Sequence, residues 1–223
     1  TGQVVVGVEW GKSGVRVTTN LGAFEAKTCV LTLPLGVLQA GNIHFDPPLP
    51  AAQAKALSAL KMGTLDKVVV RYSASDWPSA NHFGFPHQPV GVHGEVANLQ
   101  SLFGVPALMS FLAGSAAKER EQWSDAALVK ELGSTVQPIW GGKRVSNIEG
   151  SLVTRWSQDP YSRGSYSYLP PGVEPAARAW LGRPQAPLYF AGEATNEKLP
   201  ATVHGAYLSG QRAAKELDRD WKD

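Results

Sequence analysis

Near its end the sequence reads Leu188-Tyr-Phe-Ala-Gly-Glu-Ala-Thr195 and then Leu199-Pro-Ala-Thr-Val-His-Gly-Ala-Tyr-Leu-Ser-Gly-Gln-Arg212. The apolar run before Gly192 predicts a short buried strand, and Pro200 stands before a segment with helical spacing. A helix N-terminus presents unpaired N–H groups and a partial positive charge, which suit an anionic or electron-rich ligand. The pattern therefore indicates a strand–turn–helix ligand site. An ordinary connection in any α/β protein has the same pattern and stays the alternative.

Outward from this segment, apolar periodicity predicts further strands and helices in irregular order. Helices are predicted at residues 51–60 and 124–140, with Ser124 as the N-cap of the second. Runs rich in β-branched residues and bounded by turn residues predict the strands. These runs are residues 4–10, 15–19, 23–33, 67–72, 107–112 and 145–156. The sequence therefore predicts an α/β fold of the mixed α+β kind.

Composition excludes several classes of function. The 21 Lys and Arg residues nearly balance the 19 Asp and Glu residues, so neither nucleic acid nor an anionic membrane is expected as a partner. No apolar run approaches the roughly 20 residues of a membrane-spanning helix. The five histidines lack metal-ligand spacing, so no metal site is expected. A single cysteine, Cys29, cannot form an internal disulfide, which favours a reducing, cytoplasmic location.

Four motifs together point to one enzyme family. They are Leu31-Thr-Leu-Pro-Leu-Gly-Val-Leu38, Gly63-Thr-Leu-Asp-Lys-Val-Val-Val70, Thr154-Arg-Trp-Ser-Gln-Asp-Pro-Tyr-Ser-Arg-Gly-Ser-Tyr-Ser-Tyr168 and the Gly192-Glu193 segment with its following helix. With these motifs in this order, the chain resembles the flavin-containing amine oxidases, which include polyamine oxidases, monoamine oxidases and lysine-specific histone demethylases. The resemblance covers nearly the whole chain.

The resemblance implies a domain organisation. Residues 1–63 match the middle segment of an FAD-binding, Rossmann-like domain, and residues 173–223 match its C-terminal segment. Residues 64–172 match the substrate-binding domain, a mixed β-sheet flanked by helices. The family binds the ADP part of FAD with a strand–Gly-x-Gly-x-x-Gly–helix unit near its N-terminus, and this sequence contains no such fingerprint. We therefore expect the C-terminal half of an enzyme, without the ADP-binding part of the cofactor site.

The resemblance also assigns two candidate catalytic residues. Lys67 matches the family's active-site lysine, which holds a water at flavin N5. Tyr166 matches the aromatic residue that lines the substrate channel in front of the flavin. Taken singly, a lysine at a strand end that reaches solvent and a tyrosine in a core are the alternatives.

Six further residues are candidates for cofactor binding. Trp156 matches a tryptophan packed near the isoalloxazine ring, and the helix mouth Ala201-Thr202-Val203 is expected to face the flavin. Gly192 permits a close approach of backbone to ligand. Glu193 matches the family's glutamate near the ribityl and phosphate groups. A carboxylate there needs hydroxyl or backbone hydrogen bonds, so Glu193 is assigned to binding rather than to base catalysis.

Two departures from the monoamine oxidases narrow the subclass. Their flavin-linking cysteine matches Ser165, and serine cannot form that thioether, so FAD is expected to be non-covalent. Their second cage tyrosine matches Thr202, which leaves one side of the aromatic cage open, as in polyamine oxidases and histone demethylases. A secondary or extended-chain amine is therefore the expected substrate.

The resulting hypothesis is an FAD-dependent amine oxidase that oxidises an amine C–N bond by hydride transfer to flavin, with imine hydrolysis and H2O2 release. Without the N-terminal part we expect the chain to be inactive, and we expect it either to bind the missing segment or subunit or to self-associate. The alternative is a non-catalytic binding or scaffolding domain derived from an amine oxidase.

Overall fold

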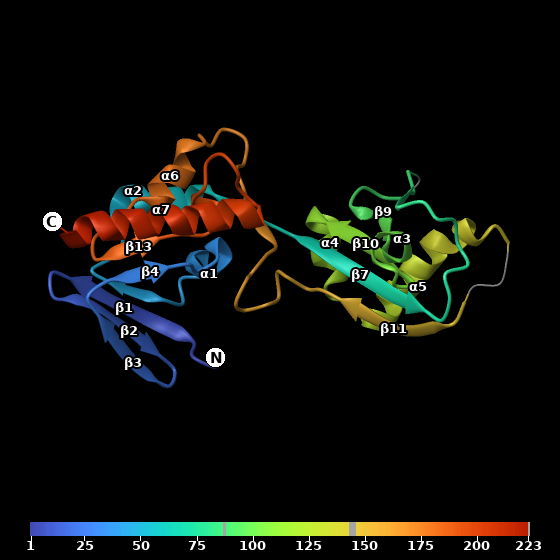
Figure 1. Cartoon of the computed structure of the whole chain (residues 1–223), viewed down its shortest axis with the longest axis horizontal. Coiled ribbons are helices and arrows are strands. Elements are labelled where there is room, and N and C mark those ends of the chain that lie inside the picture. Colours follow the sequence, from blue (N-terminus) through green and yellow to red (C-terminus); the bar gives the residue numbers. More distant parts are fainter. Residues whose placement is uncertain (87, 143–145, 223) are drawn as a thin grey trace. The chain divides into compact units, whose positions relative to one another are not determined.

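A computed structural model describes residues 1–86, 88–142 and 146–222. The chain divides into two compact units (Figure 1). The first unit combines Thr1–Gly63 with Pro160–Asp223, and the second is the continuous stretch Thr64–Asp159. Both units contain helices and strands, which confirms the mixed α/β class.

The second boundary differs from the one expected from the sequence. The chain re-enters the first unit at Pro160, whereas the expected substrate-binding domain extended to residue 172. The reason is a strand pairing: β12 (Tyr166–Tyr168) runs antiparallel to β6 (Lys61–Gly63), so the aromatic end of the third motif belongs to the first unit.

The first unit contains two further sheets. In one, the strand order is β3–β2–β1–β5, with β5 parallel to β1 and the other neighbours antiparallel; in the other, β4 and β13 run parallel. The strands are β1 (Val5–Gly11), β2 (Gly14–Thr19), β3 (Gly22–Ala26), β4 (Cys29–Leu31), β5 (His44–Asp46) and β13 (Leu188–Phe190). The expected single strand at residues 23–33 is thus two strands that belong to different sheets.

Helices complete the first unit. They are α1 (Leu35–Gln39), α2 (Ala51–Ala59), α6 (Ala176–Gly182), the short 3-10 helix η2 (Glu193–Thr195) and α7 (Val203–Lys222). Helix α7 packs along β13 (Figure 1) and against η2. It buries Gly205, Ser209 and Ala213, which are spaced four residues apart on one face. A Cβ on Gly205 would lie 1.8 Å from the carbonyl oxygen of Leu199, so only glycine fits where α7 meets the preceding loop.

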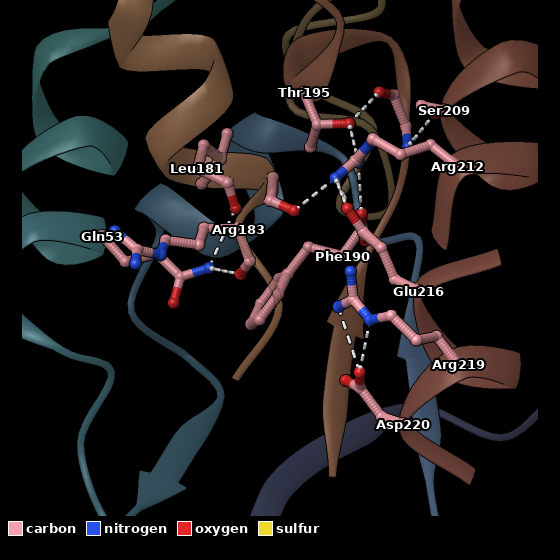
Figure 2. A network of polar contacts seen from close by, with 12 residues as sticks. Gln53, Leu181, Arg183, Phe190, Thr195, Ser209, Arg212, Glu216, Arg219 and Asp220 are labelled. Atoms are coloured by element: carbon pink, nitrogen blue, oxygen red, sulfur yellow. Dashed lines mark hydrogen bonds and ion pairs between the residues drawn. The ribbon is translucent and has the colours of Figure 1, made fainter. Parts of the chain in front are cut away.

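Arg212 of α7 ties three segments of the first unit together (Figure 2). Its guanidinium donates to the carbonyl oxygens of Gly182 (2.5 Å) and Phe190 (2.7 Å) and to the hydroxyl of Thr195 (3.1 Å). One side chain therefore satisfies acceptors at the end of α6, in β13 and in η2. These hydrogen bonds hold α7 against β13.

The second unit is built on an antiparallel sheet with the strand order β11–β7–β10–β9–β8. Its elements are β7 (Leu65–Tyr72), β8 (His82–Gly84), β9 (Val92–Asn98), α3 (Leu99–Phe103), β10 (Ala107–Ala113), α4 (Gly114–Arg120), α5 (Asp125–Val136), the 3-10 helix η1 (Gln137–Trp140) and β11 (Ile148–Val153). Helix α5 packs against β7 and β11, and the core includes buried Val68, Val70, Leu108 and Trp140.

Helix α5 differs from its expected length for a local reason. Ser124 caps it as predicted, accepting a hydrogen bond from the N–H of Ala127. The expected helix continued to residue 140, but α5 ends at Val136 and the next turn is 3-10, with Pro138 near its start. Proline has no N–H for an α-helical hydrogen bond. In the described part of the chain, no helix is long and apolar enough to cross a membrane.

Candidate functional site

Lys67 lies in β7, between β10 and β11. Its backbone is bound twice by Thr154: the N–H of Lys67 donates to Thr154 Oγ1 (2.8 Å), and the N–H of Thr154 donates to the Lys67 carbonyl (3.0 Å). The side chain is half-buried, and its ammonium lies 5.9 Å from the ring centroid of Phe111, the residue opposite in β10. Lys67 therefore presents a cation on a rigid strand beside an aromatic face.

Asp66 points to the other, buried face of the same strand. Its Oδ1 accepts hydrogen bonds from the N–H of Trp156 (2.9 Å) and from the hydroxyl of Thr154 (3.1 Å). The same carboxylate oxygen thus holds Trp156 and, through Thr154, the backbone of Lys67. Both candidate residues of the second unit are positioned by one buried carboxyl group that the sequence analysis did not single out.

A second buried carboxyl group, Glu121 at the C-terminus of α4, faces Asp66. Glu121 accepts from the N–H of Ser157 (2.8 Å) and from the Ser157 hydroxyl. The Asp66 Oδ2 atom is buried and meets no donor among the described residues. Two carboxylates are both acceptors, so their contact becomes a hydrogen bond only when one of them holds a proton.

The folded environment favours the protonated form of Asp66. Burial raises the pKa of Asp66 to about 6, and Glu121 acts in the same direction, while the hydrogen bonds from Trp156 and Thr154 oppose the rise. The sequence does contain a signal for Asp66. In the alternation of the strand it falls on the same face as Val68, Val70 and Tyr72, all of which are buried.

Tyr166 belongs to the first unit. It lies in β12 opposite Gly63, and a Cβ added to that glycine would lie 3.5 Å from the Tyr166 ring, so the ring is packed over a position without a side chain. The next residue, Ser167, is buried, whereas Tyr166 is half-buried. The strand thus anchors itself through Ser167 and keeps Tyr166 partly accessible.

Glu193 joins this strand to the helix mouth. Its Oε1 accepts from the N–H of Ser167 (2.9 Å), and its Oε2 accepts from the Ser167 hydroxyl (2.7 Å) and from the N–H of Ala201 (2.7 Å). Ala201 has a left-handed backbone, with φ of 59°, a conformation that costs a non-glycine residue free energy. A charged hydrogen bond to its N–H offsets part of that cost.

The remaining residues of the helix mouth divide into a cap and an exposed apolar residue. Thr202 is the N-cap of α7: its hydroxyl accepts from the N–H of Gly205 (3.0 Å) and donates to the Leu199 carbonyl (2.8 Å). Val203 is 88% exposed.

Gly192, just after β13, has φ of 126°, which only glycine adopts readily, and its N–H donates to Ser209 of α7 (2.8 Å).

A pocket of about 280 Å³ lies beside these residues in the first unit. Ser165, Gly192 and Glu193 line it, together with the Pro34 segment before α1. Ordinary ligand pockets measure about 300–1,000 Å³, so this pocket lies just below that range. Apolar residues make up most of its lining, and Ser165 and Glu193 add polar groups.

The candidate residues thus form two groups. Tyr166, Glu193 and Ala201 are brought together in the first unit through Ser167, while Lys67 and Trp156 are brought together in the second through Thr154 and Asp66. Among the residues with described positions, no three His, Cys, Asp or Glu side chains form a group that could hold a metal ion.

Comparison with known proteins shows the family of the chain. The family "Flavin containing amine oxidoreductase" matches residues 1–218, and the chain belongs to this family of flavoprotein oxidoreductases. A possible lysine-specific histone demethylase 1 of Drosophila melanogaster is 35% identical over 95% of the chain, which spans 26% of that protein. Polyamine oxidase 4 of Oryza sativa subsp. japonica is 36% identical over 92% of the chain, which spans 42% of it.

The fold is also that of a solved structure. Wild-type putrescine oxidase bound to putrescine superposes with a TM-score of 0.83 at 21% identity, over 97% of this chain and 48% of that one. The chain therefore spans less than half the length of each of these relatives.

Proposed function

We propose that this chain is the C-terminal half of an FAD-dependent amine oxidase. The observation that carries the proposal is the Glu193 junction. In the first unit, one carboxylate joins the strand of Tyr166 to the mouth of α7, beside a pocket of about 280 Å³. Family membership over residues 1–218 supplies the chemistry that such a pocket would serve. We further propose that the first unit is the FAD-binding part and the second unit the substrate-binding part.

Bound FAD would supply a two-electron acceptor for the hydride of an amine C–H bond, so that the amine becomes an imine, which water hydrolyses, and oxygen becomes H2O2. The residues of the chain bind, orient and shield. Tyr166 would form one wall of the amine channel, and Trp156 would pack near the ring system. Gly192, Glu193 and the residues Ala201-Thr202-Val203 would bound the cofactor, with Glu193 acting through binding and not as a base.

Lys67 is proposed as the residue that holds a water for proton handling. Its rigidity supports this role, because both polar groups of its backbone are bound by Thr154 and its strand is paired on both sides. A positioned proton donor is worth more than a mobile one, since its reorganisation is already complete.

An extended or secondary amine is the proposed substrate. Thr202 is engaged as a helix cap and carries no ring, so one side of any aromatic cage at Tyr166 stays open to a long chain. Relatives named as polyamine oxidase and as histone demethylase fit this preference.

Full-length protein containing this chain tests the proposal. It is purified, its flavin absorbance is recorded, and H2O2 release is measured with a polyamine and with a methylated-lysine peptide. We expect bound FAD and H2O2 release with at least one amine. Acid precipitation should release the yellow flavin into the supernatant and leave the protein pellet colourless, because Ser165 cannot form a thioether link. Protein without flavin, or flavin without any amine-dependent H2O2, would instead support a non-catalytic scaffolding domain.

A further inference from the structure

Arg178 in α6 is a buried cation that no motif pointed to. It is 2% exposed and is among the largest fully buried side chains of the described structure. A buried guanidinium is costly unless a negative charge and hydrogen-bond acceptors accompany it. Burial lowers the pKa of Arg178, and the negative charge of Glu193 acts against that lowering. The carboxylate that stabilises this cation is therefore the one at the centre of the candidate site.

Ser167 connects the two charges. Its hydroxyl lies 2.5 Å from Arg178 Nη1 and 2.7 Å from Glu193 Oε2. Because a guanidinium can only donate, the Ser167 oxygen accepts from Arg178, and its single proton is directed to Glu193. The hydrogen-bond order Arg178 to Ser167 to Glu193 thus follows from the chemistry of the three groups. Arg178 also donates to the Ala194 carbonyl (3.3 Å), which fixes it to η2 beside Glu193.

This series of hydrogen bonds from Arg178 through Ser167 to Glu193, the relay, ends at two backbone groups. The Glu193 carboxylate accepts from the N–H of Ser167 in β12 and from the N–H of Ala201 before α7. Tyr166 precedes the first of these residues, and Thr202 and Val203 follow the second. We propose that Arg178 is a positioning residue: through Ser167 it orients the Glu193 carboxylate and so sets the geometry of the Tyr166 strand relative to the Ala201–Val203 helix mouth.

This inference rests on the proposed function for its catalytic meaning, but its geometry is tested without cofactor. The variants are Arg178→Met, which keeps an apolar stem and removes the charge, and Ser167→Ala, which breaks the relay and keeps the arginine. Amide hydrogen exchange is measured on the full chain for peptides containing Ser167 and Ala201, with β13 peptides as the reference for global opening. Arg212→Met is the matched control, since Arg212 binds the carbonyl groups of Gly182 and Phe190 and the Thr195 hydroxyl in the same unit without touching Glu193. Because Phe190 lies in β13, exchange in this control is compared with β1 peptides instead.

We expect exchange at Ser167 and Ala201 to become about 10-fold to 100-fold faster relative to β13 in both variants, the scale of losing a charged hydrogen bond. The double variant should exchange no faster than either single one, because both break one relay, and Arg178→Lys should restore part of the protection. Equal acceleration in β13, additive effects, or the same pattern in Arg212→Met would overturn the proposal. Should Arg178→Met not fold, the Ser167→Ala and Arg178→Lys measurements decide alone.

A final readout separates this inference from the proposed function. In flavin-loaded full-length protein, Ser167→Ala should weaken FAD binding and lower kcat, while Arg212→Met should affect neither beyond its effect on unfolding. If the local exchange changes as expected but no form of the protein binds FAD, the positioning role stands and the amine oxidase proposal fails.

Discussion

Asp66 combines two properties that seldom occur together in a carboxyl group. It is 1% exposed, yet it holds the backbone of Trp156 and the hydroxyl of Thr154, so its acceptor oxygen is essential to the local structure. Its second oxygen faces another carboxyl group rather than a donor. The form of this pair that holds one proton is therefore better suited to the fold than the doubly ionised form.

This arrangement predicts an unusual pH dependence. An aspartate in the unfolded chain has a pKa of about 3.9, whereas burial raises the pKa of Asp66 to about 6 in the folded chain. Because the folded state binds the proton more tightly, the stabilising contribution is complete below about pH 4 and is lost as pH rises through about 6. Asp66→Asn keeps the accepting oxygen and gives Glu121 a permanent N–H donor.

The Asn variant should therefore be more stable than the parent at pH 7, by on the order of 1 kcal/mol or more, and should lose the pH dependence between about 4 and 6. Denaturant unfolding at a series of pH values measures both. Glu149→Gln, at an exposed ion pair with Arg71, is the control and should change little. An Asn variant that is less stable at every pH would contradict the shared proton.

The proposed proton-handling role of Lys67 can be tested by substitution. Lys67→Met in the flavin-loaded full-length enzyme should slow flavin reduction or reoxidation by roughly 10-fold to 1000-fold, the scale of losing one positioned proton-handling group. Substrate binding should change little. Stopped-flow measurement of both half-reactions decides, with Lys130→Met, at an exposed position of α5, as control. Rates within about a factor of three of the parent, under about 0.7 kcal/mol of barrier, would make Lys67 an ordinary strand lysine.

At the scale of elements, much of the structure follows from local sequence. The Ser124 cap, the strands β1, β2 and β7 and the proline-preceded helix α2 lie within a few residues of their expected positions. The strand expected at residues 23–33 was wrong as one element, because pairing partners far along the chain decide it: β3 pairs with β2, and β4 pairs with β13. Local propensity has no information about such partners.

In the candidate site, too, some residues can be identified from sequence motifs and others only from the folded structure. Lys67, Tyr166 and Glu193 stand in motifs, so the resemblance identifies them, and their roles stay predictions. Arg178 and Glu121 stand in no motif, and each matters only because folding buries its charge beside another charged group. Sequence patterns show which charges exist, while burial and pairing arise from tertiary contacts.

Helix α7 provides a prediction at this scale. Gly205→Ala should destabilise the chain by about 1–3 kcal/mol or more, because the new methyl group would lie 1.8 Å from the Leu199 carbonyl oxygen. Gly210→Ala in the same helix meets no atom within 4 Å and should stabilise it by up to about 1 kcal/mol. Urea unfolding of both variants measures the contrast. Equal effects of the two substitutions would show that α7 does not begin as described.

At the scale of the whole molecule, the first unit exposes surfaces that such folds usually cover. The β4–β13 pair is a parallel sheet, and parallel sheets are normally covered on both faces. Val30 of β4 is 39% exposed, and Val203 and Tyr207 of α7 are 88% and 68% exposed. The relatives are more than twice as long as the matched part, which leaves ample chain to cover these residues.

We therefore expect the isolated chain to self-associate and to bind FAD weakly or not at all. Under the proposed function, co-expression with the segment that precedes the matched region in a relative should yield one complex with FAD affinity restored. Analytical ultracentrifugation and calorimetric FAD titration measure the two effects. A monomer that binds FAD with sub-micromolar affinity would contradict the expectation.

The division of the first unit into two stretches of chain has a consequence for biosynthesis. The second unit is continuous, so it can fold as soon as Asp159 has left the ribosome. The first unit must wait, because β4 finds its partner only when β13 is synthesised and β6 only when β12 is. During that interval the early strands have open edges that can pair with other chains. The Glu193 junction, assembled from residues 167, 193 and 201, can therefore form only after residue 201 has been synthesised, later than the second unit. Slow synthesis after residue 159 should increase aggregation of the nascent chain.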